Sequence, residues 1–186
     1  MGLRIISGDL KGKKLFTPKG FRIRPTADRI RESIFNIISA RVAGSVVLDL
    51  FAETGALGIE ALSRGASRAL FIDNDKESLS IIKKNTTICG LEERIKIAKL
   101  NIGINSFDFL NDFPGANLIF MDPPYNKNLI RPSMAKLSAS SILEKDALLV
   151  IEHDLNESIP EDMPGYEKED QRRYGKTLVS FMKFMV

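Results

Sequence analysis

The sequence predicts an α/β fold: a mostly parallel, twisted sheet flanked by helices, with an antiparallel hairpin at its C-terminal edge. Two observations carry this prediction. Between residues 46 and 152, short apolar segments alternate with segments of helical periodicity, which is the pattern of βαβ units. Residues 166–185 then break the alternation with two strand-like segments in succession. The composition agrees, since 186 residues with 44% hydrophobic and 27% charged side chains are ordinary for one globular domain.

Each element has a local reason. Thr26 is expected to cap a helix through about residue 40, with Asp28 in its first turn and isoleucines recurring at helical spacing. Apolar runs predict strands at 46–51, 69–73, 95–98, 118–122 and 147–152. Helices are expected between them at 59–64, 76–89, 107–110 and 129–140, with Gly65 and Gly90 ending the first two. The hairpin strands are 166–173 and 177–185.

Composition excludes several classes of protein. One cysteine and one histidine leave no internal disulfide, no thiolate cluster and no histidine-rich site, so we expect no metal. The N-terminal segment lacks the apolar run of a signal peptide, and no stretch reaches the roughly 18 apolar residues of a membrane span. We therefore expect a soluble, cytoplasmic protein without a membrane partner, acting as a monomer.

Positive charge is concentrated in the first 31 residues. They hold nine basic and two acidic side chains, whereas the rest of the chain holds 18 basic and 22 acidic ones. Glycines and prolines between the basic residues predict a hairpin arm over residues 1–25, followed by the main domain over 26–186. Such an arm suits a polyanion such as RNA, and a solvated face is the alternative. The candidate RNA contacts are Arg4, Lys11, Lys13, Lys14, Arg22, Arg24 and Arg29.

Three carboxylates end predicted parallel strands, where such folds bind ligands: Asp49, Asp73 and Asp122. A dinucleotide fingerprint would need glycine at position 53, but Glu53 stands there and would repel a pyrophosphate. A cationic cofactor without phosphate, such as S-adenosylmethionine, suits this loop better, although an empty crevice is the alternative. Asp73 is placed to accept ribose hydroxyls. The candidate cofactor residues are Asp49, Phe51, Glu53, Thr54, Gly55, Gly58, Asp73 and Asn74.

The segment Asp122-Pro123-Pro124-Tyr125 is the most specific motif. Two prolines make the chain after the strand extended and rigid. The Asp122 carboxylate and the Pro123 carbonyl can accept both N–H groups of an exocyclic amine, which frees the nitrogen lone pair for methylation. Tyr125 can stack on the extruded base. These four residues are the candidate catalytic set, and a proline-rich turn with a buried tyrosine is the alternative.

Together these segments resemble the RsmD-type 16S ribosomal RNA guanine-N2 methyltransferases. The resemblance runs nearly end to end. It is carried by Arg4-Ile5-Ile6-Ser7-Gly8, Arg24-Pro25-Thr26, Arg31-Glu32, Phe35-Asn36, Leu48-Asp49-Leu50-Phe51-Ala52, the segment from Gly55 to Ala66, Asp122-Pro123-Pro124-Tyr125 and Arg173-Tyr174-Gly175-Lys176-Thr177.

This resemblance implies a class I S-adenosylmethionine-dependent methyltransferase (Rossmann-like) fold and a guanine of 16S rRNA in the small subunit as acceptor. Asp73 matches the ribose-binding acid, and Asp122 and Tyr125 match the catalytic motif. Asn101 matches the position near the adenine. The family usually has glycine where this chain has Glu53, and aspartate where it has Asn101.

Two other functions remain open. The tetrapeptide also serves DNA amino-methyltransferases that act on adenine N6 or cytosine N4, but the chain has no obvious target-recognition domain beyond the arm. A non-catalytic RNA-binding assembly factor would follow if Glu53 has ended cofactor binding. We assign no role in the site to Asn85, Cys89 or His153.

Overall fold

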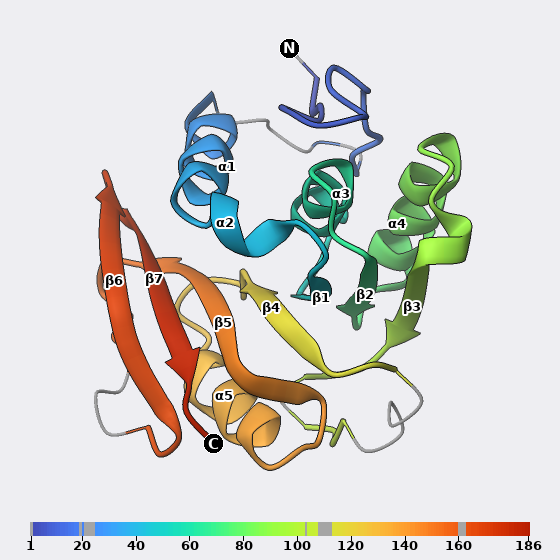
Figure 1. The fold of residues 1–186 in the computed structure, drawn as a ribbon. Coiled ribbons are helices and arrows are strands. Elements are labelled where there is room, and N and C mark those ends of the chain that lie inside the picture. The colour runs from blue at the N-terminus through green and yellow to red at the C-terminus, as the bar shows by residue number, and fades with distance from the viewer. Residues whose placement is uncertain (1, 19, 21–24, 103, 108–112, 160–162) are drawn as a thin grey trace.

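The computed structural model describes residues 2–18, 20, 25–102, 104–107, 113–159 and 163–186. Within these residues the chain forms one seven-stranded sheet of order β3-β2-β1-β4-β5-β7-β6 (Figure 1). The strands are β1 (Val46–Leu50), β2 (Arg68–Asp73), β3 (Ile95–Lys99), β4 (Ala116–Met121), β5 (Leu143–Asp154), β6 (Tyr166–Tyr174) and β7 (Thr177–Phe184). The helices are α1 (Pro25–Ile37), α2 (Ser39–Val42), α3 (Ala56–Ser63), α4 (Lys76–Ile88) and α5 (Ile130–Ser138), with a 3-10 turn at Glu92–Arg94.

Strand pairing places a topological switch at the centre of the sheet. Strands β1 to β5 are parallel, with β1 between β2 and β4. Strand β7 pairs antiparallel with both β5 and β6. The chain therefore moves outward from β1 to β3 and then crosses to β4 on the other side of β1, which creates the crevice where doubly wound sheets bind ligands. The predicted parallel sheet and C-terminal hairpin are confirmed.

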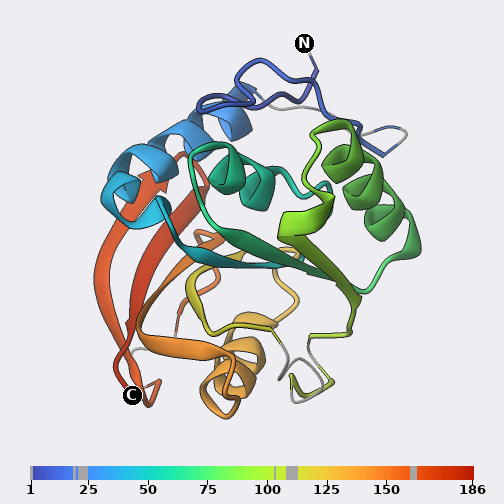
Figure 2. The same cartoon turned by 45° about the vertical axis from the view of Figure 1, so that its right-hand side comes forward.

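Helices cover both faces of the sheet. Helices α1 to α4 lie on one face and α5 on the other (Figures 1 and 2). Successive strand residues point to opposite faces, so Val47 and Phe120 join the core under α1, α3 and α4, whereas Leu48 and Met121 join the core over α5. Burial on both faces explains why these strands read as continuous apolar runs.

The N-terminal segment packs on α3 instead of standing free. Leu3, Ile5 and Leu15 belong to the buried core under α1 and α3. The buried Glu60 carboxylate accepts hydrogen bonds from the Ile6 and Ser7 amides at 2.8 and 3.0 Å.

The backbone of this segment also touches the end of α3. A Cβ at Gly8, where φ is +81°, would lie 1.9 Å from the Ser63 carbonyl oxygen, so only glycine permits this approach. The predicted hairpin is present as a short antiparallel pairing around the Arg4–Lys14 bridge, in which the amides of Ile5, Gly12 and Leu15 donate to the carbonyls of Lys13, Ile5 and Leu3. At its turn the amides of Asp9 and Leu10 donate to Ser63 of α3.

Three elements differ most from their predicted boundaries. The first helix begins at Pro25, which suits the first helical position, so Thr26 lies inside the helix and the prediction that it caps the helix is wrong. The helix ends at Ile37, before the short α2. Helix α3 begins at Ala56, because Gly55 at φ +75° already ends the loop. Strand β5 begins at Leu143 and pairs there with β4. The charged residues 144–146 interrupt the apolar pattern, so the sequence did not predict this part of the strand. The helix predicted at 107–110 falls mainly outside the described residues. No helix in the described part of the chain is long and apolar enough to cross a membrane.

Candidate active site

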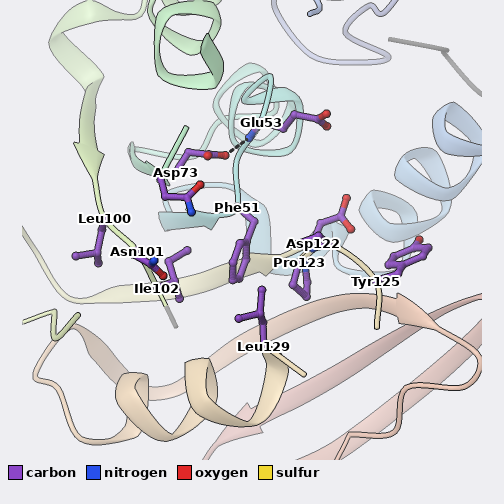
Figure 3. A pocket seen from close by; sticks show the side chains of 12 residues that line it. Phe51, Glu53, Asp73, Leu100, Asn101, Ile102, Asp122, Pro123, Tyr125 and Leu129 are labelled. Atoms are coloured by element: carbon purple, nitrogen blue, oxygen red, sulfur yellow. Dashed lines mark hydrogen bonds between the residues drawn. The ribbon is translucent and has the colours of Figure 1, made fainter. Parts of the chain in front are cut away.

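A cavity of about 420 Å³ opens at the carboxyl ends of β1, β2, β3 and β4. In Figure 3, Leu100, Asn101 and Ile102 lie on one side of it and Asp122 and Tyr125 on the other, with Phe51, Pro123 and Leu129 between them. The full lining is Phe51, Glu53, Asp73, Asn74, Leu100, Asn101, Ile102, Asp122, Pro123, Pro124, Tyr125 and Leu129. One cavity thus joins the predicted cofactor side to the predicted catalytic side.

The loop after β1 is bent tightly by its backbone. Phe51 and Glu53 both have positive φ, +58° and +48°, a region that glycine enters most easily. Gly58 in the first turn of α3 lies against Phe71, since a Cβ there would be 2.4 Å from that ring. This positive φ explains why glycine suits position 53; in this chain glutamate adopts the same backbone conformation.

Asp49 supports the loop from below instead of lining the cavity. Its carboxylate is buried and accepts the Gly58 amide at 2.9 Å. Burial raises the pKa of Asp49 to about 8, against the lowering effect of that hydrogen bond. Thr54, Gly55 and Gly58 likewise lie outside the lining, so these four predicted residues shape the loop rather than the wall.

Asp73, at the end of β2, lines the cavity and holds two neighbouring loops in place. Its two carboxylate oxygens accept the amides of Glu53 and Asp75, each at 2.9 Å. Figure 3 shows the first of these two bonds. The first bond ties the loop after β1 to β2, and the second orients the turn into α4. Each oxygen keeps a lone pair for a ligand hydroxyl.

Apolar side chains that sequence reasoning missed complete this side. Leu100 and Ile102 flank the predicted Asn101 after β3, and Leu129 precedes α5. With Phe51 they form an apolar slot beside the Asn101 amide, which suits a purine ring. Leu100 and Ile102 could have been predicted from the sequence, because they adjoin Asn101 just beyond the end of a predicted strand.

The tetrapeptide after β4, which the sequence predicts to be catalytic, forms the wall of the cavity opposite Asn101. Burial, followed by the negative charges of Glu152, Glu53 and Asp49, raises the pKa of Asp122 well above its ordinary value. The Tyr125 hydroxyl donates to the Glu152 carboxylate of β5 at 2.9 Å. Sequence reasoning did not select Glu152, because its position on the fifth strand gave no motif.

A buried amide connects the cofactor loop to the N-terminal segment. The Asn85 side chain of α4 is fully buried; it donates to the Thr54 and Phe16 carbonyls at 2.9 and 3.0 Å and accepts the Phe16 amide at 2.7 Å. Asn85, to which the sequence assigned no role, therefore supports the site from behind.

The comparisons with known proteins agree with this geometry. The family model described as "Conserved hypothetical protein 95", the RsmD family, matches residues 3–183. The protein named "Putative rRNA methyltransferase YlbH" from Bacillus subtilis is 34% identical over 181 residues, covering 97% of this chain and 98% of that protein. The chain belongs to the RsmD-type methyltransferase family.

Two further relatives extend the likeness. "Ribosomal RNA small subunit methyltransferase D" from Escherichia coli is 34% identical over 160 residues, covering 85% of this chain and 78% of that protein. The solved structure of "Putative methyltransferase yhhF from Escherichia coli" has a TM-score of 0.85 at 26% identity and covers 100% of this chain and 99% of that one. This RsmD-type methyltransferase thus has the class I Rossmann-like fold of S-adenosylmethionine-dependent methyltransferases, and S-adenosylmethionine is the methyl donor that its sequence predicts.

The lining of the cavity fits that cofactor. Among the residues described there, Glu53, Asp73 and Asp122 are carboxylates and none is basic. Such a wall attracts a sulfonium and an ammonium group and repels phosphate. Asp73 would hold the ribose, the apolar slot with Asn101 would hold the adenine, and the acids near Asp122 would face the cationic end.

Five of the seven predicted RNA contacts of this RsmD-type methyltransferase lie among the described residues, at or beside one cavity. Arg4, Lys11 and Arg29 line a second cavity of about 350 Å³ between the N-terminal segment and α1, together with Asp28 and Glu32. Lys13 and Lys14 are exposed beside it. Arg22 and Arg24 lie outside the described residues.

Proposed function

We propose that the protein methylates the N2 amino group of a guanine in 16S rRNA of the small ribosomal subunit. The observation that carries this proposal is that the Asp122–Tyr125 segment lines the same cavity as Asp73 and Asn101, the residues predicted to bind the cofactor. The names of relatives support the choice of RNA, since the Escherichia coli and Haemophilus influenzae proteins are small-subunit ribosomal RNA methyltransferases.

The chain's own groups would prepare the amine. An exocyclic amine is a poor nucleophile because its lone pair is delocalised into the base. The Asp122 carboxylate and the Pro123 carbonyl accept its two N–H groups, so the nitrogen becomes tetrahedral and its lone pair becomes available. Bound S-adenosylmethionine supplies an electrophilic methyl group. The methyl group replaces one hydrogen of the amine, and that hydrogen leaves as a proton to Asp122.

Binding of the base would fall to the aromatic and basic groups. Tyr125, whose ring borders the cavity, stacks on the extruded guanine. The basic segment over residues 1–25 binds phosphates and positions the RNA without reading its sequence. We also propose that the protein acts as a monomer in the cytoplasm.

Transfer of labelled methyl groups tests this function. Purified protein is incubated with labelled S-adenosylmethionine and, separately, unmethylated 16S rRNA, small subunits reconstituted on it, and duplex DNA. We expect label in the RNA-containing substrates and N2-methylguanosine after digestion to nucleosides. N6-methyladenine or N4-methylcytosine from the DNA would identify a DNA amino-methyltransferase instead. Binding of RNA without any transfer would identify an assembly factor.

A further inference from the structure

Glu152 lies beside the Asp122–Tyr125 segment but belongs to none of the sequence motifs. It is a partly buried residue of β5, and its Oε1 accepts the Tyr125 hydroxyl at 2.9 Å. The Thr177 hydroxyl, at the start of β7, lies 3.3 Å from the same phenol oxygen. Tyr125 is therefore tied to two strands on the far side of the switch point.

This tie determines the position of an aromatic ring. Pro123 and Pro124 restrict the backbone before Tyr125, but they leave its side-chain torsions free. A phenol bound at its tip to a rigid strand loses that freedom before any ligand arrives. The ring is then pre-organised as a stacking platform at a fixed place relative to Asp122.

The same carboxylate adds negative charge beside Asp122. The acids that face Asp122 come from three elements: Glu152 from β5, Glu53 from the loop after β1, and Asp49 from β1. After burial, Glu152 is the largest cause of the raised pKa of Asp122. A carboxylate with a higher proton affinity is a stronger acceptor for the hydrogens of an amine.

We propose that Glu152 is a positioning residue for methyl transfer: it fixes the Tyr125 ring through their hydrogen bond and, by its charge, makes Asp122 a stronger acceptor of the amine proton. This inference rests on the proposed function. It assigns to one side chain two effects, on binding of the base and on its chemistry, which different substitutions separate.

Three variants of these residues make that separation. Glu152→Gln keeps an acceptor for the Tyr125 hydroxyl and removes the charge. Glu152→Asp keeps the negative charge, but its shorter side chain moves the carboxylate away from the Tyr125 hydroxyl. Tyr125→Phe removes the hydroxyl that donates this hydrogen bond. Each is assayed with saturating S-adenosylmethionine and small subunits reconstituted on unmethylated 16S rRNA, from pH 5 to pH 9. Thermal unfolding and cofactor affinity verify that each variant is folded.

Removing the charge of Glu152 and removing its hydrogen bond to Tyr125 should have different effects on the kinetics. In Glu152→Gln the acidic limb of the profile of kcat/KM against pH moves about 1 unit lower, because Asp122 gives up its proton more easily, and KM for the subunits stays unchanged. The plateau kcat falls roughly 3- to 10-fold, since a weaker base accepts the amine proton less readily. Glu152→Asp and Tyr125→Phe raise KM several-fold without moving the limb to lower pH.

Glu157→Gln is the matched control. Its carboxylate is also buried and accepts the Asn126 amide of the following loop at 3.2 Å, but it does not line the cavity. It should leave the limb in place. A limb unchanged in Glu152→Gln, or moved equally in Glu157→Gln, would refute the role of the charge. An unchanged KM in both Glu152→Asp and Tyr125→Phe would refute the positioning. Absence of transfer by the unmodified protein would instead reject the proposed function itself.

Discussion

Asp49 and Asp73 end neighbouring strands, yet their carboxylates have different environments. Asp73 lines the cavity and accepts two backbone amides, whereas Asp49 lies beneath the loop and accepts one. Burial dominates at Asp49 and raises its pKa to about 8. A strand-end aspartate is therefore a ligand contact or a loop support according to the depth at which its carboxylate lies.

Asp49→Asn should reduce the dependence of stability on pH. In the unfolded chain an aspartate has a pKa near 3.9. Between about pH 4 and pH 8 the folded protein therefore holds a proton that the unfolded chain has released, and stability falls as the pH rises through this window. Asparagine keeps the acceptor for the Gly58 amide and has no such proton. Denaturant unfolding without cofactor at pH 5 and pH 8 should show a smaller loss in the variant; an equal loss would contradict the assignment.

Asp73→Ala should weaken binding of S-adenosylmethionine about 10- to 100-fold, because charge-assisted hydrogen bonds to the ribose are lost. Calorimetric titration measures the change. Asp75→Ala is the control, since Asp75 caps α4 by accepting the Ser78 amide at 2.8 Å and does not line the cavity. That control should lower the stability of the protein, because the cap of α4 is lost, and leave the affinity for S-adenosylmethionine unchanged. Equal affinities for the Asp73 variant and the unmodified protein would disprove the ribose assignment.

At the scale of elements, α4 holds the N-terminal segment and the loop after β1 together. The connection is the buried amide of Asn85, whose hydrogen bonds to Phe16 and Thr54 satisfy both donors and one acceptor. A backbone segment without a strand of its own thus obtains fixed partners from a side chain.

Asn85→Leu should loosen both segments at once. The substitution leaves two carbonyls and one amide without partners, which costs about 1–3 kcal/mol of stability for each group that stays buried. Amide hydrogen exchange at Phe16 should accelerate, and S-adenosylmethionine should bind more weakly because the loop is less fixed. Asn156→Leu, at an exposed position whose amide contacts only Asp154 in the described structure, is the control. Slow exchange retained at Phe16 would contradict this role for Asn85.

For the molecule as a whole, charge is separated between two surfaces. The cavity at the strand ends is lined by carboxylates, whereas the N-terminal segment and α1 present Arg4, Lys11 and Arg29 around the second cavity. An acidic cleft repels phosphates, so RNA would be attracted by the basic surface and would deliver only its base to the cleft.

Replacing Lys11, Lys13 and Lys14 by alanine should flatten the salt dependence of RNA binding. Each phosphate contact to single-stranded RNA contributes about 0.7 to the slope of log affinity against log salt, so three contacts contribute about 2 units. The comparison uses one 16S rRNA fragment and the matched triple replacement of Lys136, Lys145 and Lys168, which lie on α5, β5 and β6. Identical slopes for the first variant and the unmodified protein would show that the basic segment is a solvated face.

Local patterns predicted most of this molecule, because parallel strands buried on both faces and rigid motifs at their ends are local features. The sheet, its hairpin and the placing of Asp73, Asn101 and Asp122 at one cavity follow from them. Contacts between distant segments were not predictable in this way. Glu60 and Ser63 capture the N-terminal backbone, Asn85 reaches Thr54, and Glu152 reaches Tyr125; each joins residues at least 27 positions apart. Hydrophobic periodicity and motif spacing describe neighbouring residues only, so they do not predict contacts between residues this far apart in the sequence.

The strand order also affects the synthesis of the chain. Strand β1 lies at the centre of the sheet, but its partner β4 follows only after β2 and β3. While a ribosome is still making residues 51–115, β1 has one edge open, with Leu48 and Leu50 destined for the core. Open apolar edges attract other strands, so a nascent chain stalled at this length is the form most exposed to aggregation and to chaperones. Pairing with β4 closes this edge, and the cavity at the strand ends is complete only once β4 and the segment after it have been made.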